Sequence, residues 1–267
     1  MNYLVIKCGG SVLEKLPESF YKNLNDLHHS GKWKPVIVHG GGPLISTLLT
    51  ELGVKTTFVD GLRVTTKEVL DVVEMVLSGS VNKQLVNRIQ KAGGSACGIS
   101  GVDGALLQAK AMKNADRLGF VGEVTHVNTD FIDQILKQEH IPVISPLGVD
   151  EKGQKYNING DVAASAVAKA LSAELCFISD IEGVYRKENG ITQTLHHISK
   201  TEIEQLIEEK QITGGMIPKV QAGIEGLSGK VEQVVILNGL AENSLIDFLA
   251  GKEVGTKIFA DGERYSV

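Results

Sequence analysis

Three glycine-rich segments in this sequence each follow a short apolar run, an arrangement typical of phosphate-binding loops. They lie at residues 7–11 (KCGGS), 39–42 (HGGG) and 99–104 (ISGVDG). Ligands bind beyond the carboxyl ends of the strands in an open parallel sheet, and glycine there lets backbone N–H groups approach oxygen atoms closely. Glycine also makes ordinary tight turns. Two adjacent loops of this kind nevertheless indicate a ligand with several negative charges.

Two lysines lie beside these segments. Lys7 ends an otherwise apolar predicted strand, which should point its side chain into a cleft, and Lys219 follows Pro218, a good first helical residue. A cation in the first helical turn is unfavourable next to the helix dipole unless it faces an anion such as a polyphosphate. Either lysine alone is compatible with a solvated surface group. Together with the glycine segments they predict a phosphoryl-transfer site, where positioning and charge neutralisation carry catalysis.

The common nucleotide-binding signatures are missing from the sequence. There is no G-x-x-x-x-G-K-[ST] motif, and no G-x-G-x-x-G motif follows the first predicted strand, which disfavours P-loop proteins and Rossmann dinucleotide enzymes. No histidine has a convincing catalytic position, and His39, before a glycine segment, is interpreted as structural support. A phosphoryl acceptor that is already ionised at pH 7, such as a carboxylate, needs no general base, so a small carboxylate-bearing acceptor is compatible with the sequence.

The elements that must position these residues alternate between strand and helix. This alternation predicts an α/β fold: a three-layer αβα sandwich with a largely parallel central sheet. Further segments at 56–64, 105–110, 120–128 and around 153–158 predict hairpins that form a lid over the substrate site. The predicted strands are 3–7, 35–39, 95–99, 141–145, 175–179, 233–237 and 257–260. The predicted helices are 18–29, 44–52, 67–92, 130–138, 162–171, 200–209, 218–227 and 244–249.

Composition sets outer limits on the function. The net charge of −5 argues against non-specific nucleic-acid binding, which usually requires a basic excess. The three cysteines, Cys8, Cys97 and Cys176, lie in or beside apolar stretches and are expected to be reduced thiols, which favours a cytoplasmic protein. No signal peptide and no run long enough for a membrane span is expected. We expect one domain, 1–267, with lobes of about 1–155 and 156–267.

Five separated motifs, in order along nearly the whole chain, resemble the amino acid kinase family. They are IKCGGS (6–11), VHGGG (38–42), NGD (159–161), SDIEGV (179–184) and GGMIPK (214–219). Within the family, the segments DGLRVT (60–65) and NINGD (157–161) are most similar to members that use ATP to phosphorylate the side-chain carboxylate of N-acetyl-L-glutamate in arginine biosynthesis. The resemblance therefore implies this activity, with the acyl substrate on the N-terminal lobe and ATP on the C-terminal lobe.

The resemblance also implies a role for each matching residue. Lys7 and Lys219 would stabilise the charge of the transferred phosphoryl group, and Asp161 would orient both lysines. Arg63 would clamp a carboxylate of the substrate and Asn157 would hold its acetamido end, with further substrate contacts from Gly41, Gly42 and Asn159. Mg²⁺ would arrive with ATP and not on protein ligands. The residues expected around ATP are Gly9, Gly10, Gly41, Ser179, Asp180, Gly183, Val184, Tyr185, Gly214, Gly215, Met216 and Lys219.

Two alternatives to this function stay open. One is another member of the same family, such as a glutamate, carbamate or uridylate kinase. The sequence shows neither the C-terminal RNA-binding-type domain frequent in glutamate kinases nor the basic pocket that a uridylate kinase needs. The other is a non-catalytic nucleotide-binding regulator on the same fold. The presence of Lys7, Lys219 and Asp161 disfavours a regulator, because a sensor needs no lysines for a transition state.

A homodimer is the expected assembly. The predicted helix 67–92 has more apolar residues than one sheet face needs, so part of the stripe is expected to cover a two-fold-related partner, unless it is all internal core. The residues of this stripe are Val69, Val72, Val73, Val76, Leu77, Val81 and Leu85. The resemblance implies that arginine-inhibited hexamers have an additional N-terminal helix, whereas the first strand here is predicted to begin by Tyr3. We therefore expect a homodimer that arginine does not inhibit.

Overall fold

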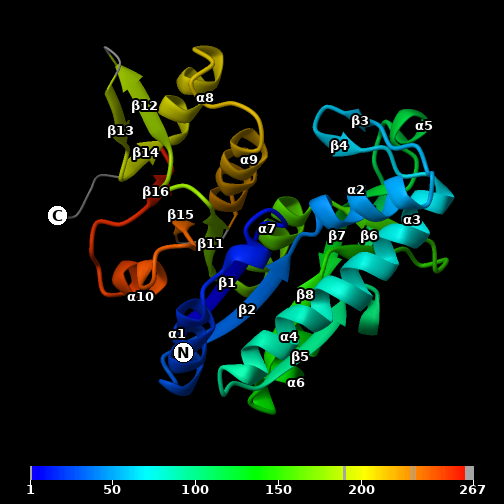
Figure 1. Cartoon of the computed structure of the whole chain (residues 1–267), viewed down its shortest axis with the longest axis horizontal. Helices are drawn as coiled ribbons and strands as arrows, with labels where there is room; N and C mark the ends of the chain where they lie inside the picture. Colours follow the sequence, from blue (N-terminus) through cyan, green and yellow to red (C-terminus); the bar gives the residue numbers. More distant parts are fainter. Residues whose placement is uncertain (1, 189–190, 230, 232, 262–267) are drawn as a thin grey trace.

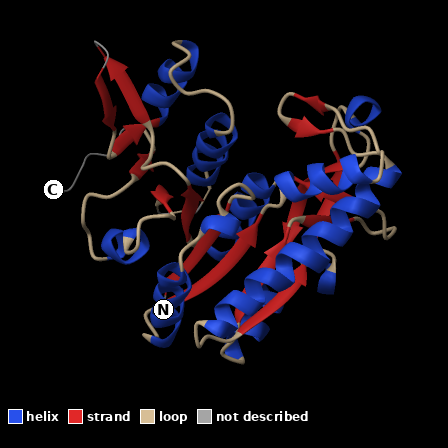
Figure 2. Ribbon diagram, in the orientation of Figure 1, coloured by secondary structure: helices blue, strands red, loops and turns tan. Residues whose placement is uncertain are grey.

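One eight-stranded sheet forms the centre of the molecule (Figures 1 and 2). The computed structural model describes residues 2–188, 191–229, 231 and 233–261. All neighbouring strands are parallel except β15 and β16. The strand order is β14 (His197–Ser199), β16 (Thr256–Phe259), β15 (Val234–Asn238), β11 (Glu174–Ser179), β1 (Asn2–Cys8), β2 (Trp33–His39), β8 (Ile141–Ser145), β5 (Ala96–Ser100). The predicted strands are confirmed, and β14 is an addition to them.

Helices cover both faces of this sheet, because successive strand residues point to opposite sides. In β1, Leu4 and Ile6 lie in one hydrophobic core and Val5 lies in the other. The first core contains side chains of α1 (Glu18–His29), α2 (Gly42–Glu51), α3 (Lys67–Glu74), α4 (Asn82–Lys91) and α10 (Ser244–Leu249). The second contains those of α6 (Thr129–Lys137), α7 (Gly160–Leu171), α8 (Lys200–Glu208) and α9 (Met216–Leu227). The predicted αβα sandwich is therefore confirmed.

The predicted helix 67–92 is one continuous run that contains a π-helix, η2 (Met75–Val81), between α3 and α4. Its buried residues Val73, Leu77, Val81, Leu85 and Ile89 recur every fourth position. An α-helix has 3.6 residues per turn, so such a stripe drifts away from the core. The wider π turn corrects this drift, so that α4 packs on β5 and β8 of the main sheet while α3 packs on α2.

The apolar stripe of this helical run is internal. All seven of the residues expected to cover a partner are buried within the single chain, with exposures from 0% to 6%. The prediction that part of the stripe covers a partner was therefore wrong. The alternative, that the whole stripe is internal core, is confirmed. The reason is that the π turn directs the stripe toward both the sheet and α2. The homodimer itself stays a prediction.

A second, smaller sheet lies beside the main one. It is a closed four-stranded sheet of β6 (Leu107–Ala111), β7 (Val121–Val127), β9 (Leu147–Val149) and β10 (Lys155–Ile158). Most of the segments predicted as hairpins thus join one closed unit. Glycines make this closure possible, because a Cβ on Gly122 would lie 2.6 Å from the Cβ of Tyr156, and one on Gly148 would lie 2.6 Å from the Cβ of Ala109.

Two hairpins stand apart from both sheets. The first is β3 (Phe58–Val59) with β4 (Leu62–Arg63), and the second is β12 (Tyr185–Glu188) with β13 (Ile191–Thr194). Figure 1 shows them on opposite sides of the carboxyl end of β1. Short helices η1 (Leu13–Lys15), η3 (Asp103–Ala105) and α5 (Ala115–Leu118) complete the described elements. Within the described ranges, no helix combines the length and apolar composition that crossing a membrane requires. The division into lobes at about residue 155 stays a prediction.

Candidate active site

The loops after β1 and β2 are packed directly against each other. A Cβ on Gly10 would lie 2.9 Å from the backbone nitrogens of Gly41 and Gly42, so no side chain fits between the two loops. On its other side, Gly41 packs on η2, where a Cβ would lie 2.7 Å from Cδ2 of Leu77. The glycines therefore place backbone N–H groups from two strands at one point, which is the arrangement expected for phosphate binding.

The third glycine segment has a packing role. A Cβ on Gly101 would collide with the carbonyl oxygen of Leu147 at 1.9 Å, which shows that the loop after β5 lies tightly against the small sheet. Neither of the two cavities of the site, described below, is lined by residues 99–104. In this segment, glycine therefore serves tight turns and close packing, the alternative given for glycine in the sequence analysis.

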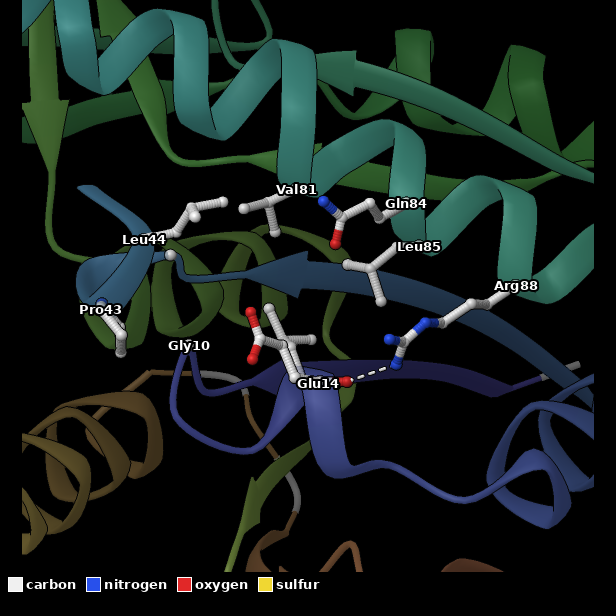
Figure 3. Close-up of a pocket in the computed structure, with 10 residues that line it drawn as sticks. Gly10, Glu14, Pro43, Leu44, Val81, Gln84, Leu85 and Arg88 are labelled. Carbon is white, nitrogen blue, oxygen red and sulfur yellow. Dashed lines mark hydrogen bonds between the residues drawn. The ribbon is translucent and has the colours of Figure 1, made fainter. Parts of the chain in front are cut away.

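A small cavity lies behind the first two loops, between η1, α2 and the long helical run (Figure 3). Its volume is about 30 Å³, room for roughly one water molecule. Val81 and Leu85 close it on the helix side. Next to them, Arg88 donates a hydrogen bond of 2.7 Å to the carbonyl oxygen of Leu13, the bond drawn in Figure 3. The loop after β1 is therefore held from behind by side chains of the long helical run.

Lys7 and Asp161 form a buried ion pair at the carboxyl end of β1. Their charged atoms are 2.6 Å apart, and the two residues are only 5% and 6% exposed. Asp161 lies in the first turn of α7, where the helix dipole favours a negative charge. Asn159 caps this helix, and its Oδ1 accepts the N–H groups of Asp161 and Val162. The predicted pair is thus positioned by the NGD motif itself.

Lys219 lies in the first turn of α9, close to this ion pair. Its Nζ donates to the carbonyl oxygen of Gly215 at 3.1 Å. Burial lowers the pKa of Lys219, and so does the nearby charge of Lys7, whereas the charges of Asp161 and Asp180 raise it. The structure therefore brings both predicted lysines and two carboxylates into one electrostatic cluster, in which the lysines can neutralise the charge of a bound phosphate.

The cavity on the N-terminal side has a volume of about 300 Å³. The predicted residues Lys7, Gly10, Gly41, Gly42, Arg63, Asn157, Asn159 and Asp161 all line it. The other lining residues come from distant segments and were not predicted. They are Ser11, Gly40, Pro43, Ile45, Phe58, Gly61, Leu62, Leu77, Val121, Pro146, Ile158 and Gly160. Most resemble ordinary core or turn residues in sequence, so local patterns carry no signal for them.

Arg63 is the only guanidinium in this lining and is held in place by uncharged groups. Its Nη1 donates to Thr56 Oγ1 at 2.9 Å, and its Nη2 donates to the carbonyl oxygen of Gly42 at 3.1 Å and to Ser46 Oγ at 2.8 Å. The guanidinium lies 4.7 Å from the ring centre of Phe58. Arg63 is 8% exposed, and no carboxylate of the described residues pairs with it. A buried cation without a counter-ion favours an anionic ligand.

The second cavity, of about 270 Å³, lies against the C-terminal half of the chain. Predicted nucleotide-binding residues line it: Ser179, Asp180, Gly183, Val184, Tyr185, Gly215, Met216 and Lys219. Its other lining residues are Ser11, Ile181, Gln211, Ile212 and Thr213. Gly9 and Gly214 line neither cavity. Gly9 accepts the N–H groups of Val12 and Leu13, and Gly214 makes its turn with a φ of +56°.

The two cavities meet at the loop after β1. Ser11 lines both of them, and Lys7 and Lys219, one from each cavity, are close enough to affect each other electrostatically. A phosphoryl group transferred between ligands in the two cavities would therefore pass beside both lysines. The geometry fits direct transfer between two bound molecules.

Comparison with known proteins agrees with this arrangement. The family model described as "Amino acid kinase family" matches residues 2–238. A protein of Oceanobacillus iheyensis named acetylglutamate kinase is 48% identical over 256 residues, which cover 96% of each chain. A protein of the same name from Geobacillus sp. is 51% identical over 237 residues, or 88% of this chain and 90% of that one.

A solved structure is similar over almost its full length. The crystal structure of smu.665 from Streptococcus mutans UA159 superposes with a TM-score of 0.84 at 33% identity, covering 97% of this chain and 99% of that one. The expected resemblance is confirmed by the family model, by the curated relatives and by the fold. The chain belongs to the amino acid kinase family.

Proposed function

We infer that this chain transfers the γ-phosphoryl group of ATP to the side-chain carboxylate of N-acetyl-L-glutamate, a step of arginine biosynthesis. The observation that carries this proposal is the buried cation of Arg63, which lies in a cavity that meets the nucleotide cavity at Ser11. A small substrate with two carboxylates can pair one with Arg63 and present the other at the junction. The name of the curated relatives, acetylglutamate kinase, supports this choice of substrate.

The proposed reaction is a single displacement at phosphorus. An oxygen of the side-chain carboxylate attacks the γ-phosphorus, and the bond to the β-phosphate oxygen breaks, which gives N-acetyl-L-glutamyl 5-phosphate and ADP. Lys7 and Lys219 neutralise the charge on the phosphoryl oxygens, while the N–H groups of Gly10 and Gly41 donate to phosphate. Asp161 keeps Lys7 in place through their ion pair. Since the acceptor is already ionised, no general base takes part.

ATP is proposed to occupy the cavity that contains Lys219. The turn before α9 and the N-terminus of this helix offer N–H groups and a positive helix end to phosphate. Among the described residues, no group of three or more His, Cys, Asp or Glu side chains is placed to hold a metal ion. We propose that Mg²⁺ would bind together with the nucleotide, held mainly by phosphate oxygens and water, where it would neutralise charge on the nucleotide.

The test is an ADP-release assay with a panel of acceptors. We expect N-acetyl-L-glutamate to have the highest kcat/KM, about 100-fold or more above L-glutamate, because a site built around specific polar groups rejects analogues that lack the matching group. Carbamate and UMP complete the panel, and Lys7→Ala protein purified in the same way controls for contaminating kinases. Faster turnover of glutamate or carbamate, or no turnover of the acetylated substrate, would contradict the proposal.

We also propose a cytoplasmic homodimer. Cys8 and Cys176 are buried free thiols, in keeping with a reducing compartment. Met75, on the outer side of the long helical run, is 56% exposed and offers an apolar contact to a two-fold-related copy. Light scattering during size exclusion should give twice the chain mass of 28.6 kDa, with or without arginine. A hexameric mass, or inhibition by millimolar arginine, would contradict this assembly.

A further inference from the structure

Thr65 is a fully buried polar residue directly behind the substrate cavity. It is 0% exposed, and its side chain contacts two residues that line the cavity. The Thr65 hydroxyl donates to the carbonyl oxygen of Arg63 at 2.9 Å, and the side-chain amide nitrogen of Asn157 lies 3.1 Å from the same hydroxyl. Thr65 therefore connects the proposed carboxylate clamp to the proposed contact for the acetamido group.

The hydroxyl of Thr65 determines which end of the Asn157 amide faces it. A hydroxyl has one hydrogen, and a carbonyl oxygen can only accept. Because that hydrogen is given to the carbonyl of Arg63, Thr65 can only accept from its other partner. Asn157 must then present its NH₂ group to Thr65, which leaves Oδ1 as the free acceptor. Within the described part of the chain, no group donates a hydrogen bond to this Oδ1.

The backbone around this pair is also fixed. The N–H of Thr65 donates to Leu118, its carbonyl accepts from Phe120 at 2.7 Å, and the N–H of Asn157 donates to the carbonyl of the same Phe120. Phe120 thus links the backbones of Thr65 and Asn157, which keeps their side chains within hydrogen-bonding distance of each other.

We propose that Thr65 is a positioning residue that makes Asn157 an acceptor, so that the site selects substrates with an N–H beside the α-carbon. This inference rests on the proposed function. An amide N–H of the substrate would donate to Asn157 Oδ1, whereas an ester oxygen at the same place would bring two acceptors together. The site would then reject the ester isostere of the substrate, O-acetyl-2-hydroxyglutarate, although the two molecules have nearly the same shape.

The experiment compares kcat/KM for N-acetyl-L-glutamate with kcat/KM for this ester. The wild-type protein should prefer the amide by about 10- to 100-fold, since leaving a buried acceptor unsatisfied is costly. In Thr65→Val, which removes the hydroxyl but keeps the shape, Asn157 can turn either end to the ligand. We expect the preference to fall below about 3-fold, with KM for the amide raised about 10-fold and kcat changed less than about 2-fold.

Two controls separate positioning from a structural role. Thr65→Ser keeps the hydroxyl and should keep the wild-type preference. In an Asn157→Ala background, Thr65→Val should have no further effect on KM, because Thr65 is proposed to act through Asn157. Thermal melting identifies variants that do not fold. A full additional effect of Thr65→Val in the Asn157→Ala background would overturn the proposal.

The wild-type protein alone also tests the proposal, even if every variant unfolds. A wild-type protein that phosphorylates N-acetyl-L-glutamate but accepts the ester equally well would overturn the inference about Thr65 and leave the proposed function intact. A wild-type protein without activity on N-acetyl-L-glutamate would overturn the proposed function itself. The two failures therefore give different results in the same assay.

Discussion

The two cavities of the site differ in how their polar side chains are held. On the substrate side, Arg63 makes hydrogen bonds to Thr56, Gly42 and Ser46, and Asn157 is held by Thr65. On the nucleotide side, the one hydrogen bond of the Lys219 side chain to another described residue goes to the carbonyl of Gly215, just before its helix, and Asp180 is exposed. The polar side chains of the substrate cavity are thus fixed before any ligand binds. The charged side chains of the nucleotide cavity can still adjust their positions to the ligand.

This difference fits the tasks of the two ligands. A small acid must be distinguished from similar acids, and a polar site does so best when its donors and acceptors already point in fixed directions. A polyphosphate has many equivalent oxygens and is attracted by charge and N–H groups over a wider range of positions. The substrate cavity should therefore respond to loss of supporting hydrogen bonds, and the nucleotide cavity to loss of charge.

The largest effect is expected from removing either lysine. Lys7→Ala and Lys219→Ala should each lower kcat by about 10²-fold or more, because groups aimed at developing charge are worth roughly 3–4 kcal/mol. Steady-state kinetics at saturating ATP and substrate measures this. Lys67→Ala, which removes an exposed lysine paired with Asp71, is the matched control and should leave kcat unchanged. A near-normal kcat in Lys219→Ala would remove this lysine from the mechanism.

Arg63→Ala should act on the substrate cavity alone. We expect KM for N-acetyl-L-glutamate to rise about 30-fold, with KM for ATP changed less than about 2-fold, because a clamp that binds ground state and transition state equally affects KM. Arg117→Ala removes an exposed arginine and serves as the control. An equal rise of both KM values would mean that the two cavities are not organised separately.

The buried His39, next to the second glycine loop, should make the stability of the folded protein depend on pH. Its Nδ1–H donates to the carbonyl of Gly40, its Nε2 accepts from Asn82, and burial lowers its pKa to about 4. The unfolded chain takes up this proton below about pH 6.5, and the folded protein does so only near pH 4, so stability falls as the pH drops through that window. Between pH 7 and pH 5 this loss is about 2 kcal/mol.

Urea denaturation at both pH values measures this loss. The comparison is with His39→Asn, which has no titrating ring and should lose about 2 kcal/mol less over the same range. The exposed His126 provides the control, since His126→Asn should behave like the wild type. A wild-type protein and a His39→Asn variant with the same pH dependence would show that folding does not lower the pKa of His39.

The smallest effect is expected from Ser46→Ala. The hydroxyl of Ser46 accepts from Arg63 at 2.8 Å, and a hydrogen bond to a charged group contributes about 1.5 kcal/mol. KM for the acetylated substrate should therefore rise about tenfold, with no change in KM for ATP. Thr50→Ala, one turn further along α2, removes a hydroxyl that bonds only within its helix. If both variants have the same KM, the fixed geometry of Arg63 does not depend on its partners.

Most of the fold followed from local patterns. Helices α1 and α10 begin and end at their predicted residues, and β8 does as well, because amphipathic period and apolar runs fix these elements locally. The strands β9 and β14 have three residues each and could not be recognised by period. The π-helix also escaped prediction, since its wider turn is set by what the stripe packs against and not by residue type.

The sequence by itself determined which side chains can do chemistry and at which strand ends they lie. Glycine and lysine at the end of a buried strand have a defined place, because strand ends in a parallel sheet share one edge. Only the tertiary structure decided how these groups are supported. Ser46 and Arg63 are 17 residues apart, and Thr65 and Asn157 are 92 apart. No local periodicity links such pairs, and their hydrogen bonds exist only because the fold brings their strands and helices together.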